Sequence, residues 1–157
     1  GPALEARLAQ PSGLARDETG GVLYFADSET SAVRRLSLDG APRVDTLVGT
    51  GLFEFGDANG AFERARLQHP LGLAWCDGRV IVADSYNGKL RVLDLDHGEV
   101  SDVGENGFAC ADGSRLPGGE PAGVAAAGPG RLLVTDTNNH RVMEVLTDER
   151  VLRTWAR

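Results

Sequence analysis

The sequence predicts an all-β fold made of three copies of one antiparallel sheet. Glycine is frequent, at 21 of 157 residues, and short apolar runs lie between the glycines, as expected for short strands joined by tight turns. The pattern Pro-x-Gly-apolar-Ala occurs three times, beginning at Pro11, Pro70 and Pro121. Each copy is followed, after a turn, by an apolar run that ends in an aspartate and a hydroxyl residue.

Each repeat contains the material for four strands. The first strand begins at the proline, and the second ends at Asp27, Asp84 or Asp136. Apolar residues at fixed offsets after each aspartate indicate a third strand, and residues 44–48, 99–103 and 151–155 form the fourth. Four short strands in a meander are the construction of a propeller blade. One such sheet cannot bury both of its faces, so neighbouring blades are expected to stack.

The blade boundaries follow from these strands. The whole chain, residues 1–157, is predicted to be one propeller segment, with blades at about 9–50, 68–104 and 119–157 and connectors at 51–67 and 105–118. Residues 1–8 align with residues 60–67, so the chain is expected to begin inside a connector. This alignment favours further blades upstream in a longer parent protein.

The repeat resembles a known family. The succession Pro-x-Gly-apolar-Ala, apolar-Ala-Asp-Ser and Asn-x-Lys/Arg-apolar is similar to the NHL repeat, with residues 87–90 and 139–142 as its name-giving segment. Blade 1 departs from it at residues 30–33. Residues 49–60 and 67–72 resemble the subgroup in which a thioredoxin-like domain precedes an NHL propeller. The resemblance implies that the three blades are half of a six-bladed ring. It also implies a protein-binding or RNA-binding platform, while related six-bladed propellers include lyases and lactonases.

The residues that recur in every blade are interpreted as structural. An aspartate at the end of the second strand can accept N–H groups of the turn that starts the third strand. A catalytic acid would not be needed three times at equivalent positions. The recurring set is Asp27, Asp84, Asp136, Asn87, Asn139, Gly13, Gly72 and Gly123.

Composition weighs against several partners. The net charge of −7 disfavours nucleic acid, which needs a basic surface, so RNA binding is the lesser alternative. Most of the arginines are expected on solvent-facing sides of strands or turns. No run of 18 apolar residues predicts a membrane span, and no signal peptide is visible, so a cytoplasmic location is expected. The arginines considered are Arg34, Arg35, Arg64, Arg66 and Arg91.

No cofactor, metal site or catalytic residue is predicted. His69, His97 and His140 occupy different positions in their blades, whereas a zinc site needs converging ligands. Residues 56–60 lack the full ligand series of a calcium loop. Cys76 and Cys110 form no metal or redox motif and are expected to be free thiols.

Aromatic residues in the connectors are the candidate contacts for a protein partner. Exposed rings on a loop can anchor a partner, although in loops of this length rings often pack beneath their own loop. The predicted function is a non-catalytic binding or scaffolding module. The alternative is part of a lyase-type or hydrolase-type enzyme with its site at the channel mouth. The partner is a protein or the remaining blades, and a homodimer could close a six-bladed ring. The candidate contacts are Phe53, Phe55, Phe62, His69 and Phe108.

Overall fold

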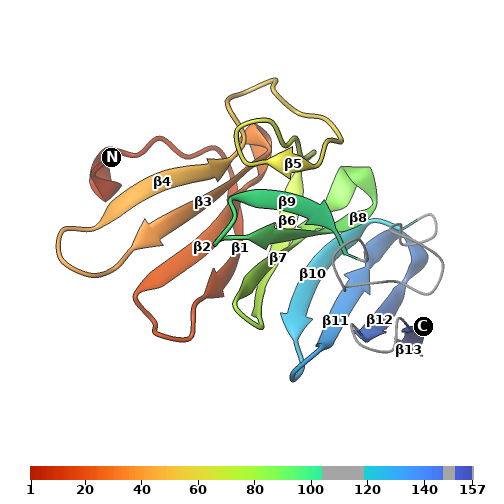
Figure 1. The fold of residues 1–157 in the computed structure, drawn as a ribbon. Helices are drawn as coiled ribbons and strands as arrows, with labels where there is room; N and C mark the ends of the chain where they lie inside the picture. The colour runs from red at the N-terminus through yellow and green to blue at the C-terminus, as the bar shows by residue number, and fades with distance from the viewer. Residues whose placement is uncertain (104–118, 147–150, 157) are drawn as a thin grey trace.

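Three antiparallel sheets make up the part of the chain that the structure describes (Figure 1). The structure is a computed structural model that describes residues 1–103, 119–146 and 151–156, without the side chains of 151–153. Blade 1 comprises β1 (Pro11–Arg16), β2 (Val22–Asp27), β3 (Ala32–Ser37) and β4 (Arg43–Val48). Blade 2 comprises β6 (Pro70–Cys76), β7 (Arg79–Asp84), β8 (Lys89–Asp94) and β9 (Glu99–Asp102), and blade 3 comprises β10 (Pro121–Ala126), β11 (Arg131–Asp136), β12 (Arg141–Leu146) and β13 (Val151–Ala156). The predicted all-β fold with one meander per repeat is confirmed.

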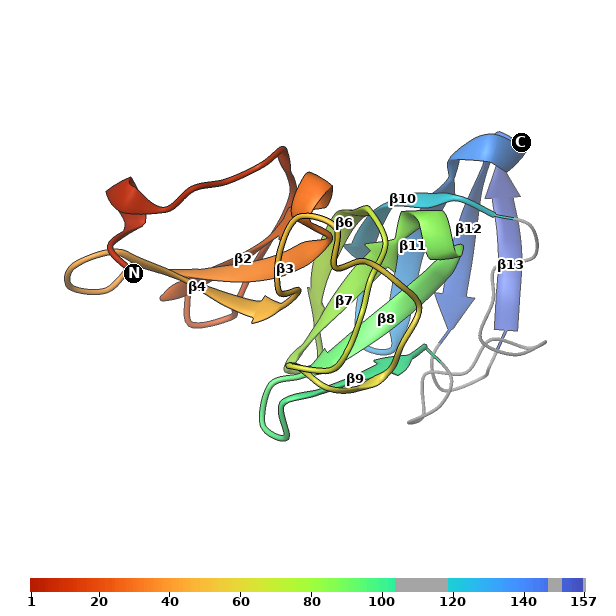
Figure 2. The same cartoon turned by 90° about the horizontal axis from the view of Figure 1, so that it is seen from above.

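The blades lie side by side in chain order (Figure 2). The first strand of each blade packs on the preceding blade: β6 contacts β1 and β2, and β10 contacts β6 and β7. Alternate residues of a strand point to opposite faces, and both faces of blade 2 are apolar because each packs on another sheet. Tyr24 and Ala26 meet Leu73 and Val82 in one core, and a second core joins blades 2 and 3. Burying each such large side chain contributes about 1.5–3 kcal/mol.

A 3-10 turn ends the second strand of every blade. The turns are η2 (Ser28–Thr30), η3 (Ser85–Asn87) and η4 (Thr137–Asn139), and a further short turn, η1 (Ala3–Glu5), lies near the N-terminus. The next residue is left-handed in each blade, with φ of 49° at Ser31, 63° at Gly88 and 51° at His140. This conformation reverses the chain into the third strand. No helix in the described ranges is long and apolar enough to span a membrane.

The connector between blades 1 and 2 is more than a loop. Its short strand β5 (Gly60–Ala61) pairs with β9, the outermost strand of blade 2, so this sheet has five strands rather than the four expected. The N-terminal residues occupy the same place on blade 1, because Gly1 donates to the Val44 carbonyl at 2.7 Å and Pro2 pairs with Arg43. The alignment of residues 1–8 with 60–67 thus corresponds to a repeated structure.

Candidate functional site

The recurring aspartates are completely buried, and each binds the backbone just before the first strand of its blade. Asp27 Oδ1 accepts the Ala9 N–H at 2.6 Å, and Asp84 Oδ1 accepts the Gln68 N–H at 2.7 Å. In blade 3, Asp136 Oδ1 accepts the Glu120 N–H at 3.0 Å. These donors precede the first strand, so the prediction from the sequence, which placed the donors in the turn before the third strand, is wrong. The reason is that strands one and two are antiparallel, so the end of the second faces the start of the first.

An arginine from the third strand neutralises each of these carboxylates. Arg34 lies 2.8 Å from Asp27 Oδ2, and Arg91 lies 2.8 Å from Asp84 Oδ2. In blade 3 the arginine comes two positions earlier in the repeat, and Arg141 Nε donates to Asp136 at 2.7 Å. The asparagines add to this, with Asn87 Nδ2 and Asn139 Nδ2 each 2.9 Å from the aspartate of their own blade. Arg34 and Asp27 form an ion pair, whereas Asp84 and Asp136 accept charge-assisted hydrogen bonds from their arginines. These contacts give the repeated aspartates a structural role.

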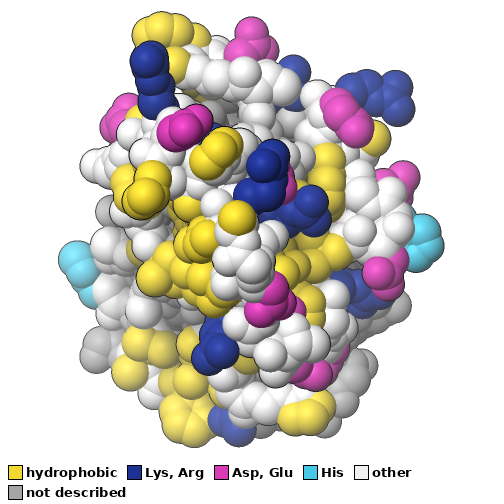
Figure 3. All heavy atoms as spheres, turned by 90° about the vertical axis from the view of Figure 1, so that its left-hand side faces the viewer, with side chains coloured by type: hydrophobic (Ala, Val, Ile, Leu, Met, Phe, Trp, Pro, Cys, Tyr) yellow, Lys and Arg dark blue, Asp and Glu magenta, His cyan; other side chains and the backbone are white. Residues whose placement is uncertain are grey.

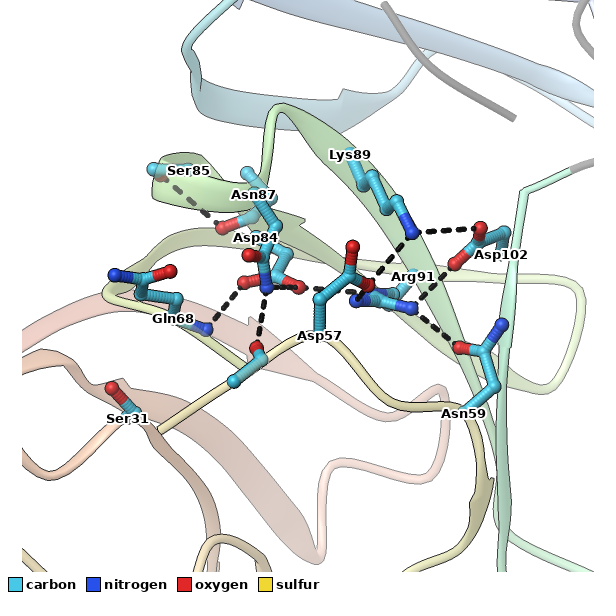
Figure 4. Close-up of polar contacts among 12 residues, drawn as sticks. Ser31, Asp57, Asn59, Gln68, Asp84, Ser85, Asn87, Lys89, Arg91 and Asp102 are labelled. Atoms are coloured by element: carbon cyan, nitrogen blue, oxygen red, sulfur yellow. Dashed lines mark hydrogen bonds and ion pairs between the residues drawn. The ribbon is translucent and has the colours of Figure 1, made fainter. Parts of the chain in front are cut away.

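Arg91 is the centre of a larger ion-pair network in blade 2 (Figure 4). Its Nε donates to Asp84, its Nη1 lies 2.5 Å from both Asp102 and Asn59, and its Nη2 lies 2.5 Å from Asp57. The Arg91 side chain is 0% exposed, so the expectation that it lies on a solvent-facing side is wrong. The connector covers it, and a charge can be buried when several carboxylates surround it.

The network ties the connector to blade 2. Asp57 also accepts from Lys89 Nζ at 2.7 Å, and Asn87 Nδ2 donates to the Gly56 carbonyl at 2.7 Å. Burial would raise the pKa of Asp57, but its hydrogen bonds and ion pairs with Lys89 and Arg91 outweigh burial and hold that pKa below its usual value. Residues 56–60 therefore hold the connector against blade 2. Within the described ranges, no group of three or more His, Cys, Asp or Glu side chains has the arrangement of a metal site.

A hollow of about 290 Å³ opens between blades 1 and 2 beside the turns η2 and η3. Phe53 is 85% exposed and Phe55 is 55% exposed, and both come from the start of the connector. Tyr86, on η3, is 60% exposed and stacks on His69 with ring centroids 4.5 Å apart. The hollow combines aromatic side chains with polar ones; its lining residues are Ser28, Glu29, Ser31, Leu52, Phe53, Phe55, Gln68, His69 and Tyr86.

The structure brings three of the five candidate contact residues together. Phe53, Phe55 and His69 line the hollow, but Phe62 packs against the core between blades 1 and 2. Phe62 is therefore not an exposed contact, because the connector turns inward after β5. Phe108 lies outside the described residues. Tyr86 was not predicted from the sequence. Its signal there is an aromatic residue at a position where the other blades have Glu29 and Asn138.

The cysteine that the structure describes is buried. Cys76 is the last residue of β6 and is unpaired, as expected. Burial in the core between blades 2 and 3, together with the neighbouring Asp77 carboxylate, raises the pKa of its thiol to about 11. A thiol with this pKa stays protonated and unreactive near neutral pH. Cys110 lies outside the described residues.

Known proteins share the repeat and the fold. Residues 119–143 match the NHL repeat family. NHL repeat-containing protein 2 of Gallus gallus is 41% identical over 168 residues, which cover 94% of this chain and 22% of that protein, so the chain spans about a fifth of this relative. Two solved structures have the same fold. An auxiliary nutrient binding protein from Bacteroides ovatus has a TM-score of 0.68 at 15% identity over 96% of this chain and 39% of its own. A gluconolactonase from Xanthomonas campestris has a TM-score of 0.66 at 20% identity over 96% of this chain and 48% of its own. The three in-register repeats, the stacked sheets and these similarities agree: the chain belongs to the NHL-repeat family of β-propellers.

Proposed function

We propose that the chain is a binding module that holds a segment of a protein partner in the hollow lined by Phe53, Phe55, His69 and Tyr86. The observation that carries this proposal is the exposure of three aromatic rings beside one hollow. The free energy falls when a partner covers large rings that are exposed to water, and such rings dominate the energetics of many interfaces.

The surroundings of the rings favour a basic anchor side chain. Glu29 lies on the wall of the hollow, and the whole chain carries a net charge of −7. An arginine side chain has an apolar stem for the rings and a guanidinium group for Glu29, and it can stack on aromatic faces. The partner is therefore a protein segment with an exposed arginine or lysine beside apolar residues.

The scaffold beneath the hollow suits a binding role. The connector that carries Phe53 and Phe55 is fastened a few residues later, where Asp57 contacts Lys89 and Arg91. His69 is held by its backbone N–H, which donates to Ser31 Oγ at 3.2 Å. A fixed loop base lowers the conformational entropy that binding must remove.

The polar groups of the chain support this role better than an enzymatic or RNA-binding one. Asp57, Asp84 and Asp102 are occupied by Lys89 and Arg91, and they serve the fold. Arg34 and Arg91, two arginines considered for RNA, are bound to carboxylates of their own blades. A phosphate backbone would have to compete with these internal ion pairs.

Panning of a random peptide library displayed on phage against the immobilised chain tests the proposal. We expect enriched peptides with a basic residue beside apolar ones, and an affinity about tenfold lower for Phe55→Ser than for the wild type, because one anchor contact is lost. The matched control is Leu38→Ser, since Leu38 is also exposed, at 44%, but lies in the turn at the opposite end of blade 1.

Two outcomes would contradict the proposal. Enriched peptides that bind Phe55→Ser and the wild type equally would move the binding site elsewhere, and a failure to enrich any peptide would remove the peptide-binding role.

A thioredoxin-like domain, suggested by the resemblance of the connector, is a second ligand. Its affinity can be measured for the wild type, Phe55→Ser and Leu38→Ser.

A further inference from the structure

The two walls of the hollow come from segments that lie far apart in the chain. Phe53 and Phe55 belong to the start of the connector, whereas Tyr86 belongs to the turn η3 of blade 2. The rings can contact one ligand together only if the two segments keep a fixed distance from each other. A contact between the connector and η3 would therefore decide the shape of the hollow.

Asn87 makes such a contact. It directly follows Tyr86, and its Nδ2 donates to the carbonyl oxygen of Gly56, which directly follows Phe55, at 2.7 Å. The same Nδ2 donates to Asp84 Oδ2 at 2.9 Å (Figure 4). An amide group has two hydrogens and can make both bonds at once. One side chain thus connects the residues next to two of the exposed rings.

The contact to Gly56 differs in kind from the contacts that hold Asp57. The cations of β8 bind the Asp57 carboxylate, so the backbone of the connector can still shift as that side chain rotates. Asn87 binds the backbone carbonyl itself, and the Gly56 N–H donates to the Leu67 carbonyl at 3.0 Å. These two bonds hold the backbone of Gly56 from both sides, so Asn87 fixes the path of the chain immediately after Phe55.

The turn itself does not need an amide at this position. Thr30 is the equivalent residue of blade 1, and its Oγ1 donates to the Asp27 carbonyl oxygen at 2.9 Å. The turn η2 that contains it is a 3-10 turn, as η3 and η4 are. In blade 3, Asn139 Nδ2 donates to both carboxylate oxygens of Asp136, at 3.1 and 2.9 Å. A threonine can therefore close the turn, and the bond to the connector is an additional contact of Asn87.

We propose that Asn87 is a positioning residue of the hollow, which holds the connector with Phe53 and Phe55 in a fixed place relative to Tyr86. The consequence for binding rests on the proposed function, because a hollow that is already formed loses less conformational entropy when a peptide enters it. Without the Asn87 amide the rings remain, but the connector that carries two of them moves more. The net contribution of one hydrogen bond corresponds to a change of about 3- to 10-fold in an equilibrium.

Hydrogen exchange without any ligand tests the coupling. The variant Asn87→Thr copies the residue of blade 1, so the turn should fold while the bond to Gly56 is lost. We expect NMR to show that the Gly56 amide exchanges about 3- to 10-fold faster in Asn87→Thr than in the wild type. The matched control is Asn139→Thr, the same substitution in blade 3, which should leave the exchange of Gly56 unchanged. Asn87→Ala should reproduce the faster exchange, because it also lacks the amide.

Peptide affinity tests the consequence for the hollow. The probe is a fluorescein-labelled peptide that panning enriches and that loses affinity in Phe55→Ser. This requirement excludes peptides that bind elsewhere, since hydrophobic side chains also gather across the outer face of blade 1 (Figure 3). We expect fluorescence anisotropy to give an affinity about 3- to 10-fold lower for Asn87→Thr and unchanged for Asn139→Thr. In the double variant Asn87→Thr with Phe55→Ser, the loss should be smaller than the product of the two single losses, because Asn87 acts on binding through the position of Phe55.

The outcomes separate this proposal from the proposed function. Equal exchange of Gly56 in Asn87→Thr and the wild type would overturn the coupling, whatever panning gives. Faster exchange with unchanged peptide affinity would overturn the positioning role and leave the binding function in place. Losses that multiply in the double variant would also overturn that role, because Asn87 would then act independently of Phe55. If panning enriches no peptide, the proposed function fails, whereas faster exchange of Gly56 would still support the coupling.

Discussion

Blades 1 and 2 carry the same four-strand repeat, but equivalent side chains lie in different surroundings. Leu14 is mostly exposed and Leu73 is buried, although both follow the same Pro-x-Gly. Arg34 and Arg91 both pair with the aspartate of their blade, yet the Arg34 side chain is 18% exposed and that of Arg91 is 0% exposed. The difference arises because blade 2 has a blade on each side and a connector across it. Burial is therefore a property of the position in the fan, and the repeat alone does not decide it.

The largest difference between the two blades is expected for the arginines. Arg91→Ala leaves Asp57, Asp84 and Asp102 without their shared cation and should lower the free energy of unfolding by about 3–5 kcal/mol. Arg34→Ala leaves the buried Asp27 carboxylate without its cation, at a site where the arginine side chain is 18% exposed to water. It should lower the free energy of unfolding by about 1–2 kcal/mol. Urea unfolding at one protein concentration measures both, and equal losses would contradict the comparison.

A smaller difference is expected for the inner-strand glycines. Gly72→Ala forces a methyl group against the backbone of blade 3 and should cost about 1–3 kcal/mol through overpacking. Gly123→Ala meets only the Thr135 side chain of its own blade, so it should change the free energy of unfolding little. Urea unfolding at one protein concentration measures both variants, and equal losses for Gly72→Ala and Gly123→Ala would contradict this expectation.

The smallest effect concerns the pH dependence of the stability that the ion pairs of Asp57 contribute. The pKa of Asp57 in the folded chain lies below its ordinary value of 3.8, so its ion pairs contribute stability above that value and lose it as the pH falls through the folded pKa. We expect Asp57→Asn to cost about 1 kcal/mol at pH 6 and progressively less toward pH 3, because the group is partly exposed. The control is Asp39→Asn, which makes the same substitution at an exposed carboxylate in the β3–β4 turn. Parallel pH profiles of the free energy of unfolding for the wild type and Asp57→Asn would show that the ion pairs of Asp57 do not contribute to stability.

Much of the fold and part of the site could be predicted from the sequence, for an identifiable reason. The strands follow from residues close in the chain, and the three copies confirm one another's register. The direction of the aspartate hydrogen bonds was not predicted, since their donors lie 16 or 18 residues away and are brought close by strand pairing. Phe53 and Phe62 look alike in a glycine-rich connector, and only the path of the chain distinguishes the exposed ring of Phe53 from the partly buried ring of Phe62.

The sequence by itself determined the repeat, the strands, the turns and the positions that need glycine. These depend on local backbone preference and on a side-chain period of two, which can be read from neighbouring residues. Only the tertiary structure decided that Arg91 is buried among three carboxylates and that Tyr86 and His69 stack beside Phe55. Each of these depends on contacts between segments distant in the chain, and the energy of a charge or a ring depends on what surrounds it.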